Sequence, residues 1–246
     1  MKISALIIAR NEENIIENTL KSISFVDEIV VILDRSVDKT KFVCKKYTKK
    51  IFSGVWTCEG KRRNYGIKKC TSEWILEIDA DEIVSKNLKK EILKKKNLTE
   101  FDFFYIKLLN FVGTKPIKFG WMACMAPDGK FCFFKKKAKK WSRGLVHPSY
   151  NIKGKKGPEF DNYIIHHMSK NISDLVERFN RNTSLHSKEL KKQGNKKKSI
   201  SLRKIISRFI KSFVFRKGYK GGGVGFLIAI LNAIYPLISS IKSYER

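Results

Sequence analysis

The sequence predicts an α/β fold in which an open, mostly parallel sheet is flanked by helices and followed by a basic helical extension. Over the first hundred residues, short apolar runs alternate with segments of helical spacing, which is the pattern of consecutive βαβ units. From about residue 171 the pattern becomes helical and strongly basic. With 246 residues, of which 42% are apolar, the chain is long enough for one large domain or for a domain with an appendage.

The first hundred residues supply the parallel sheet. Ile3–Ala9 is a continuous apolar run, as expected of a parallel strand that is buried on both faces. Asn11–Ser24 follows it with apolar residues at helical spacing. The remaining elements are expected at Glu28–Leu33 (strand), Asp38–Tyr47 (helix), Ile51–Phe52 (short strand), Glu59–Cys70 (helix) and Trp74–Ile78 (strand).

The middle of the chain, residues 101–170, changes character. Aromatic-rich strands are expected at Phe101–Leu108 and Lys130–Phe134, and a further short strand at Asn162–His167. Gly and Pro residues separate these strands. This α+β part is expected to build the second wall of a cleft within the same domain.

The C-terminal part is basic and helical. Residues 170–220 contain 16 Lys and Arg against 3 Asp and Glu, a net charge of +13. Ser199–Phe215 places apolar residues on one stripe and bases off it, which predicts a basic amphipathic helix. Val224–Ile241 is an uncharged stretch of 18 residues that contains Asn232 and Pro236, at the lower limit for a membrane span. An anchor in the membrane plane or shallowly inserted is expected, and a buried core helix is the alternative.

The charge balance narrows the classes of partner. The chain has 52 Lys and Arg against 23 Asp and Glu, a formal charge of +29. Such a charge favours nucleic acid, an anionic membrane face or a phosphorylated ligand. No nucleic-acid-binding motif is recognisable, and the aromatic residues stand mostly in apolar runs and not between exposed cations. Nucleic acid is therefore not the expected partner, and it is kept as an alternative.

The cysteines and the N-terminal segment indicate a reducing compartment. The five cysteines are odd in number and never spaced C-x-x-C, which argues against a zinc ribbon and against a disulfide framework. The first apolar run has only seven residues before Arg10, Asn11 and two Glu, so it is expected to be a strand and not a signal peptide. A cytoplasmic protein with reduced thiols is expected.

An acidic cluster ends the fourth expected strand, where residues 74–82 read WILEIDADE. In sheets of this kind, ligands bind beyond the carboxyl ends of the strands. Asp79 and Asp81 are two positions apart and can face one site where the strand begins to turn. Their hard oxygens suit Mg²⁺ or Mn²⁺, which in turn bind phosphate oxygens. The cluster therefore indicates either a cation that holds a diphosphate or a solvated acidic turn.

Four segments, in this order, carry a resemblance to a known family: LIIARNEENIIENTLKSI, EIVVILDRSVDKT, GKRRNYGIKKCTSEWILEIDADE and the basic helical tail. Together they resemble the family 2 glycosyltransferases with the GT-A fold, above all bacterial members that add sugars to lipopolysaccharide inner core or capsule-like glycans. The resemblance implies inverting transfer from a nucleoside-diphosphate sugar, with a UDP-sugar as the expected donor. The implied acceptor is a hydroxyl of a glycan or lipid-linked molecule such as a lipopolysaccharide core.

The resemblance also implies an organisation and residue roles. It assigns residues 1–100 to a nucleotide-sugar-binding half, 101–170 to the acceptor side and 171–246 to a membrane-associating extension. Asp81 matches the catalytic acid that binds the divalent cation, Mg²⁺ or Mn²⁺, and Asp79 matches the neighbouring acid of that metal site, nearer the ribose or sugar. The residues expected to bind the nucleotide-sugar are Ala9, Asn11, Glu12, Asp34, Arg63, Asn64 and Asp79.

Two further acids and one base near these motifs receive roles from their chemistry. Arg63 is a plausible diphosphate contact, because guanidinium forks match phosphate oxygens. Asp38 is expected to cap the helix that follows it. Glu77 precedes Asp79 by two positions on the strand and is expected to be structural.

The catalytic base is left open by the sequence. Related members often have V-H-E downstream, whereas this chain reads LVHPSY, with Pro148 after His147. Proline cannot accept a proton, so the candidates for the base that takes the acceptor's proton are Glu159, Asp161 and His147. His147 is also a candidate metal ligand. Of the pair His166–His167, one is expected to face the cleft and the other to pack, because strand neighbours point to opposite faces.

Three functions follow. The first is a glycosyltransferase held on the anionic cytoplasmic membrane face through residues 199–241, as a peripheral or monotopic protein. The second, motivated by Pro148, is a catalytically impaired relative that binds sugar nucleotides without turnover. The third is a basic nucleic-acid-binding protein. In the first two, Trp121 and Trp141 either stack on sugar rings or fill the core.

Overall fold

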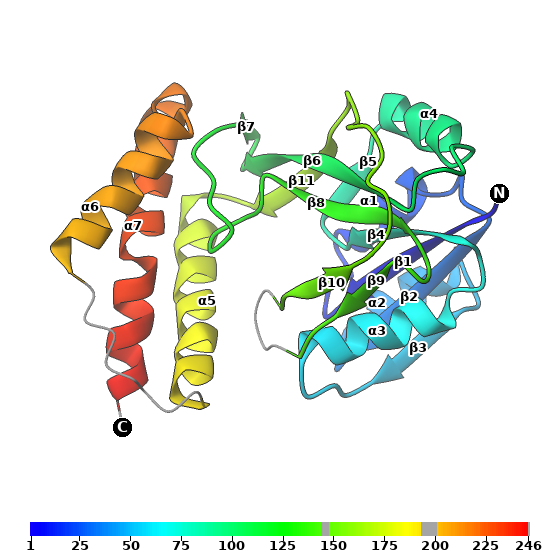
Figure 1. Ribbon diagram of the computed structural model, residues 1–246. Coiled ribbons are helices and arrows are strands. Elements are labelled where there is room, and N and C mark those ends of the chain that lie inside the picture. The colour runs from blue at the N-terminus through cyan, green and yellow to red at the C-terminus, as the bar shows by residue number, and fades with distance from the viewer. Residues whose placement is uncertain (144–147, 193–200, 246) are drawn as a thin grey trace. The chain divides into compact units, whose positions relative to one another are not determined.

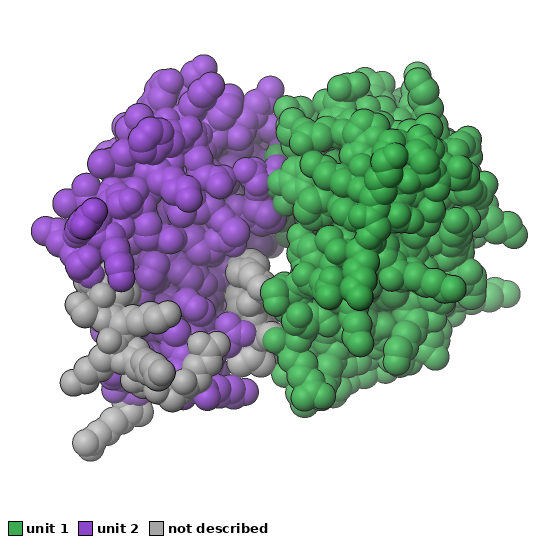
Figure 2. Space-filling model, in the orientation of Figure 1, with its two compact units in different colours: residues 1–108, 129–144, 148–166 green, residues 109–128, 145–147, 167–246 purple. Residues whose placement is uncertain are grey.

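The computed structural model describes residues 1–143, 148–192 and 201–245. Within them the chain forms two compact units, which Figure 2 shows in different colours. The first unit contains residues 1–108, 129–143 and 148–166. The second contains residues 109–128, 167–192 and 201–245.

The described strands form a large mixed sheet and a separate two-stranded one (Figure 1). The order in the large sheet is β3-β2-β1-β4-β8-β6-β11-β5, with β7 paired to β6. Strands β3, β2, β1 and β4 are parallel, as predicted, while β8 is antiparallel to both β4 and β6. The strands are β1 Ile3–Ala9, β2 Glu28–Asp34, β3 Ile51–Gly54, β4 Trp74–Asp79, β5 Glu82–Val84, β6 Phe103–Val112, β7 Lys115–Ile117, β8 Gly129–Lys135, β9 Lys139–Trp141, β10 Tyr150–Ile152 and β11 Ile164–Ser169.

The register of the parallel strands brings the sequence motifs to one edge. Ile8 of β1 lies opposite both Ile32 of β2 and Asp79 of β4. Because the three strands are parallel, the residues that follow their carboxyl ends share this edge of the sheet. The segments that begin at Arg10, Arg35 and Ala80 are therefore neighbours.

Helices cover both faces of the parallel half. Successive side chains of a strand point to opposite faces, so Ile7 packs in one apolar cluster with Leu20 of α1, and Leu6 in another with Ile67 of α3. A Cβ added at Gly66 would lie 2.5 Å from the Leu6 side chain, so glycine lets α3 approach the sheet closely. The helices of the first unit are α1 Ile16–Ser22, α2 Thr40–Lys45, α3 Glu59–Lys69 and α4 Lys86–Lys95.

Two of these helices begin later than their periodicity predicts. Asn11 adopts a φ of 56°, and its Oδ1 accepts the N–H of Val37 at 2.9 Å. This bond holds the segment after β1 against the segment after β2, so α1 starts only at Ile16. The Asp38 carboxylate accepts the N–H of Thr40 at 3.1 Å, just before α2. Asp38 does not occupy the expected cap position, because the N-cap residue of α2 is Lys39 and no side chain caps this helix.

The second unit contains the helices α5 (Ile172–Lys192), α6 (Leu202–Ile210) and α7 (Gly222–Tyr244), coloured yellow, orange and red in Figure 1. A π-helical turn, Lys211–Phe215, and a 3-10 turn, Gly218–Gly221, join α6 to α7. By length and composition the helical stretch around α7 could cross a membrane. In this structure, however, Ile228, Leu231 and Tyr235 pack in one apolar cluster with Leu175 and Phe179 of α5.

The two polar interruptions of α7 are satisfied inside the second unit. Asn232 is fully buried, and its Nδ2 donates to the Gly120 carbonyl and to the Ser212 hydroxyl, both at 3.0 Å. Pro236 has no N–H, which leaves the Asn232 carbonyl without its helical partner. That carbonyl accepts a hydrogen bond from Arg208 Nε at 2.9 Å. These contacts favour the core-helix alternative for this apolar stretch.

Candidate active site

The D-A-D-E turn joins two strands of the first unit. Asp79 ends β4 and Glu82 begins β5, and the Glu82 carboxylate accepts the Asp79 N–H at 2.9 Å. The carbonyl of Ala80 accepts a hydrogen bond from the Thr19 hydroxyl at 2.7 Å, which ties the turn to α1. Asp79 keeps a side-chain exposure of 33%, whereas Glu82 is buried. The turn thus leaves part of the Asp79 carboxylate accessible to solvent, while the buried Glu82 carboxylate binds the backbone N–H of Asp79.

A histidine completes the surroundings of Asp81. β11 pairs with β5 so that His166 lies opposite Glu82, and the His166 Nε2 is 3.4 Å from the Asp81 Oδ2. In the second unit, the ring of His167 lies against that of Phe111, with 5.3 Å between centroids. The two histidines therefore point apart, as strand alternation predicts, and it is His166 that reaches the D-A-D-E turn.

Six buried or half-buried side chains form a ladder of alternating charges beneath the turn. We call it the charge ladder, and its members come from five different elements. Its two ends are Lys139 of β9 and Glu82 of β5. The consecutive distances are Lys139 Nζ–Glu77 Oε2 2.9 Å, Glu77 Oε1–Arg63 Nη1 2.6 Å, Arg63 Nη2–Asp79 Oδ1 3.2 Å, Asp79 Oδ2–Lys130 Nζ 3.0 Å and Lys130 Nζ–Glu82 Oε2 2.6 Å.

Burial and the neighbouring charges shift the titration of the ladder. Burial acts to raise the pKa of Asp79 and Glu77, yet the adjacent cations hold both pKa values below their usual range. The pKa of Glu82 is raised, because burial and the negative charge of Asp79 outweigh the attraction of Lys130. The ladder therefore keeps Asp79 and Glu77 ionised, the form in which a carboxylate can bind a cation or a cationic side chain.

Other residues expected to bind the nucleotide-sugar gather on the same edge. Ala9 is the buried last residue of β1, and Asn11 follows it in the turn that contacts Val37. The N–H of Glu12 donates to the Thr40 hydroxyl at 2.8 Å. Asp34, at the end of β2, is 1% exposed. The ends of β1, β2 and β4 therefore share one edge of the sheet, and the role of these residues in binding a nucleotide-sugar stays a prediction.

Asp34 is held by two arginines. Arg35 Nε approaches it to 3.0 Å and Arg62 Nη1 to 2.8 Å. Burial acts to raise the pKa of Asp34, but the hydrogen bonds from both guanidinium groups lower it overall. An ionised carboxylate oriented in this way can accept hydroxyl donors at the edge of the sheet.

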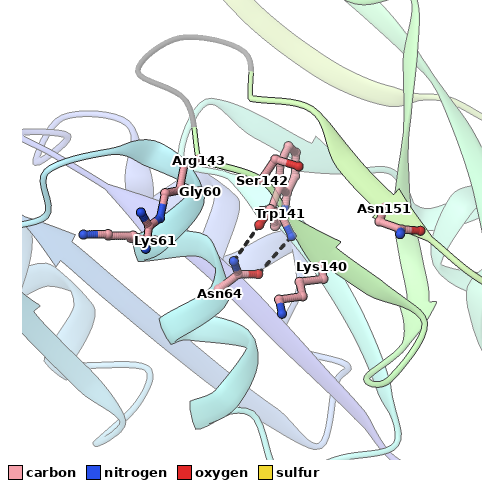
Figure 3. A pocket seen from close by; sticks show the side chains of 8 residues that line it. All are labelled: Gly60, Lys61, Asn64, Lys140, Trp141, Ser142, Arg143 and Asn151. Carbon is pink, nitrogen blue, oxygen red and sulfur yellow. Dashed lines mark hydrogen bonds between the residues drawn. The ribbon is translucent and has the colours of Figure 1, made fainter.

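Arg63 and Asn64 connect α3 to the rest of the site. Arg63 binds Glu59 at 2.7 Å in addition to its two partners in the ladder, and its guanidinium lies 4.9 Å from the ring centroid of Trp141. The side-chain amide of Asn64 exchanges two hydrogen bonds with the backbone of Trp141, at 2.8 and 3.0 Å (Figure 3). Trp141 thus forms a wall over Arg63, whereas the buried Trp121 fills the core of the second unit.

A pocket of about 410 Å³ opens beside Trp141 and the start of α3 (Figure 3). Its described lining carries three cations, Lys61, Lys140 and Arg143, and no carboxylate. The amides of Asn64 and Asn151 supply further hydrogen-bonding groups. A pocket of this composition suits an anionic group more than a neutral one.

The candidate bases are less closely tied to the turn. Glu159 is half exposed and pairs with Lys107 at 3.0 Å and with Lys156 at 3.7 Å. The N–H of Asp161 donates to Glu91 of α4 at 3.0 Å. These described contacts attach both residues to β6, α4 and their own loop. His147 lies outside the described residues, so the identity of the base stays a prediction.

The donor set fits a divalent cation that is completed by its substrate. Within residues 1–143, 148–192 and 201–245, no group of three or more His, Cys, Asp or Glu side chains could hold a metal ion alone. Mg²⁺ is commonly bound by one or two carboxylates together with substrate phosphates. The turn supplies the carboxylates of Asp79 and Asp81, with His166 Nε2 3.4 Å from Asp81 Oδ2. Substrate phosphates would complete the shell of a cation held by these groups.

Lys130 and Lys139 are the site residues that the sequence did not reveal. Lys130 begins the aromatic strand expected at residues 130–134, and Lys139 follows that strand by five residues. The only sequence feature that could indicate a role for either is a lysine at a position that faces inward. Among 52 Lys and Arg such a signal cannot be distinguished from the surface lysines. Glu77, expected to be structural, lies between Lys139 and Arg63 in the ladder.

A family model and several known proteins match the sequence of this chain. The model of the family described as glycosyl transferase family 2 matches residues 4–142. An uncharacterized glycosyltransferase of Rickettsia bellii is 29% identical over 99% of this chain and 86% of its own length. The lipopolysaccharide core biosynthesis glycosyltransferase LpsC of Rhizobium meliloti is 20% identical over 100% of this chain and 93% of its own length.

A solved structure shows the same fold. TarS of Staphylococcus aureus, residues 1–349 in complex with UDP-GlcNAc, superposes with a TM-score of 0.51 at 14% sequence identity. The match covers 99% of this chain and 89% of that one. The mixed sheet and its flanking helices are thus those of the GT-A fold. The chain belongs to glycosyl transferase family 2, and it is a glycosyltransferase.

Proposed function

We propose that this glycosyltransferase moves a sugar, with inversion, from a nucleoside-diphosphate sugar to a hydroxyl of a glycan or lipid-linked acceptor. The observation that carries the proposal is the D-A-D-E turn, where Asp79 is held by two cations and Asp81 lies beside His166. It lies on the edge that also contains Asn11 and Asp34. A UDP-sugar is the expected donor, in line with the UDP-GlcNAc complex of TarS.

The residues of the turn would divide the work. Asp81 and His166, which lie 3.4 Å apart, would hold a divalent cation together with Asp79; by resemblance His147 is a further candidate ligand. When bound, the cation would neutralise the charge that develops on the diphosphate leaving group. Asp34 would accept hydrogen bonds from hydroxyls of the nucleoside. Arg63 would hold the carboxylates of Asp79 and Glu77 in place through its two ion pairs. One of Glu159, Asp161 and His147 would take the acceptor's proton on the opposite face of the sugar.

The acceptor class is inferred from the relatives and from the cationic pocket. LpsC is named for lipopolysaccharide core biosynthesis. The pocket of Lys61, Lys140 and Arg143 could receive an anionic group of such an acceptor. A lipopolysaccharide core or a similar anionic glycan is therefore the proposed acceptor.

A screen of sugar nucleotides tests the donor. The melting temperature is measured with UDP-, GDP-, dTDP- and ADP-sugars, each with Mn²⁺ and with EDTA. Since a ligand that binds only the folded state stabilises it by about 2.7 kcal/mol at a hundred times its Kd, one nucleotide class should raise the melting temperature, and only with Mn²⁺. Stabilisation by RNA and by none of the sugar nucleotides would refute the proposal. Binding without sugar-nucleotide hydrolysis or transfer would favour the catalytically impaired relative.

The exposed side of α6 supports membrane association. Leu202, Ile206, Ile210 and Val214 follow one another at four-residue spacing and keep exposures of 70, 49, 39 and 50%. They lie on one stripe of the helix and its π-helical continuation. The bases around this stripe are also exposed, namely Arg203, Lys204, Lys211, Lys217 and Lys220. An apolar stripe framed by cations suits the interface of an anionic membrane.

The opposite side of α6 is fixed to α7. Phe209 stacks on Phe213, and both rings contact Phe226 of α7 edge-on, at 5.7 Å between centroids. Because α7 packs in the core of the second unit, we propose that α6 makes the membrane contact and α7 supports it. Within the predicted range 199–241, the contact would thus be confined to α6 and the turns that follow it. The protein would then be peripheral on the cytoplasmic face.

Vesicle binding tests this surface. Replacing Ile206 and Ile210 by Gln should weaken binding to vesicles of equal parts phosphatidylglycerol and phosphatidylethanolamine by about tenfold or more, since burying each apolar side chain contributes about 1.5–3 kcal/mol. Co-sedimentation measures the bound fraction. Phe42→Gln is the matched control, because Phe42 is 66% exposed on α2 of the first unit. Equal binding of the double variant and wild type would rule out insertion by α6.

A further inference from the structure

We infer that Lys130 is a positioning residue that makes binding of the divalent cation depend on the diphosphate. The inference rests on the proposed function of the D-A-D-E turn, and it assigns a role to a residue that the sequence motifs do not contain. Lys130 would stay paired with the Asp79 carboxylate until the phosphates of the substrate bind. The cation would then be held only as part of a complex with the sugar nucleotide.

The contacts of Lys130 place it at the centre of the turn. Its Nζ lies 3.0 Å from Asp79 Oδ2 and 2.6 Å from Glu82 Oε2. The same Glu82 oxygen accepts the N–H of Asp79 at 2.9 Å. Lys130, Asp79 and Glu82 therefore form a closed ring of three interactions, in which Asp79 and Glu82 are the first and last residues of D-A-D-E. Its side chain is 18% exposed, so water screens this cation poorly.

Both carboxylate oxygens of Asp79 are engaged with cations. Oδ1 lies 3.2 Å from Arg63 Nη2, and Oδ2 is taken by Lys130. A dication that approached Asp79 would meet two positive charges at hydrogen-bonding distance from its ligand. Asp81 lies outside the ladder, beside His166. Mg²⁺ is commonly held by one or two carboxylates together with substrate phosphates, so the turn is expected to bind a dication weakly while Asp79 is paired with Arg63 and Lys130.

The negative charges of a diphosphate remove this obstacle. They add oxygen ligands and offset the field of Lys130, so the cation and the nucleotide should bind with positive coupling. By linkage the same factor must appear in the nucleotide's affinity. Lys130 would therefore keep the free enzyme from holding a metal ion tightly and would leave the turn ordered for the metal–nucleotide complex.

Mn²⁺ titration tests the inference. Binding is followed by the electron paramagnetic resonance signal of free Mn²⁺, with and without UDP, in wild type and in Lys130→Met. In wild type, Mn²⁺ should bind weakly alone and at least tenfold more tightly with UDP. In K130M the affinity without UDP should rise by about ten- to a hundredfold, the range in which outer-shell residues change metal affinity. The coupling with UDP should shrink to the same extent.

Two further variants separate this role from a structural one. Lys135→Met removes a cation from the same strand, β8, that pairs with Asp102 at 3.2 Å and belongs to no pair of the ladder, so Mn²⁺ affinity without UDP should stay within about twofold of wild type. The double variant K130M/E82Q removes both members of the Lys130–Glu82 pair, which protects folding if K130M alone unfolds. In it, Mn²⁺ should still bind more tightly than in wild type, because Asp79 Oδ2 is released.

The outcomes are distinct. Unchanged or weaker Mn²⁺ binding in K130M, or in the folded double variant, would overturn the inference, because a merely structural lysine predicts a loss. A gain of equal size in K135M would also overturn it. If wild type binds no Mn²⁺ with any of UDP, GDP, dTDP and ADP, the proposed function of the turn itself fails. If wild type shows the UDP coupling but the Lys130 variants do not gain affinity, only the role of Lys130 fails.

Discussion

Replacing Asp81 by Asn is expected to lower kcat/KM for sugar transfer by about a thousandfold while the protein stays folded. The amide keeps the size of the side chain but loses the negative charge that would face the cation. A metal ion contributes several kcal/mol of charge stabilisation to a transition state, and about 4 kcal/mol corresponds to a thousandfold in rate. Steady-state transfer with Mn²⁺ and the preferred sugar nucleotide measures the loss.

The control for this variant is an exposed aspartate of the second unit. Asp128→Asn removes a carboxylate that pairs with Arg216 at 3.0 Å in the second unit, and it should leave kcat/KM within about twofold of wild type. The melting temperature of each variant is recorded beside its activity. Full activity in D81N would show that Asp81 is not a ligand of a catalytic cation.

Replacing Glu77 by Ala is expected to have the largest effect on stability. Glu77 is 1% exposed and lies between Lys139 and Arg63. Without it, Lys139 keeps its contact with the Phe131 carbonyl but loses its only ion-pair partner in the described residues. Removing one member of a buried ion pair typically costs about 3–5 kcal/mol, because the other charge stays buried. Urea denaturation measures the free energy of unfolding.

A paired replacement gives the contrast. In Glu77→Leu/Lys139→Met both members of the innermost pair become apolar, so no uncompensated lysine is left in the core. The double variant should therefore be more stable than Glu77→Ala, even though both variants lack the ion pair between Glu77 and Lys139. If the single and double variants lose equal stability, packing and not charge explains the role of Glu77.

The acidity of Glu77 gives this prediction a pH dependence. In the folded protein its pKa lies below the ordinary value of 4.5, since burial is outweighed by Lys139 and Arg63. A lowered pKa means that the stabilisation is present above about pH 4.5 and is lost as the pH falls through the folded-state value. The E77A protein should lack this part of the acid destabilisation, which unfolding curves at descending pH would reveal.

The parallel half of the fold follows directly from the sequence. β1, β2 and β4 are nearly continuous apolar runs, and only strands buried on both faces need that composition. The same logic places the acids of WILEIDADE at the carboxyl edge, where the structure has them. The late start of α1 could not be predicted, because it depends on the bond between Asn11 and Val37, 26 positions apart.

The rest of the site depends on contacts that periodicity does not report. The sequence pattern of a lysine is the same whether it is solvated or paired, so it does not single out Lys130 in the aromatic strand β8 or Lys139 in the basic stretch of residues 135–141. The apolar stretch of α7 suits a core helix as well as an anchor. The partners of Asn232 favour the core helix, and one of them, Gly120, lies 112 positions away in the sequence. Periodicity did predict the amphipathic stripe of α6, but only packing determines which of its residues stay exposed.

The central claim is that the D-A-D-E turn binds a diphosphate through a divalent cation. Calorimetric titration with UDP, GDP, dTDP and ADP, in Mn²⁺ and in EDTA, tests it most directly. One nucleotide should bind at least about tenfold more tightly in Mn²⁺ than in EDTA, and D81N should abolish that difference. Equal affinity in Mn²⁺ and EDTA, or a difference that persists in D81N, would contradict the claim.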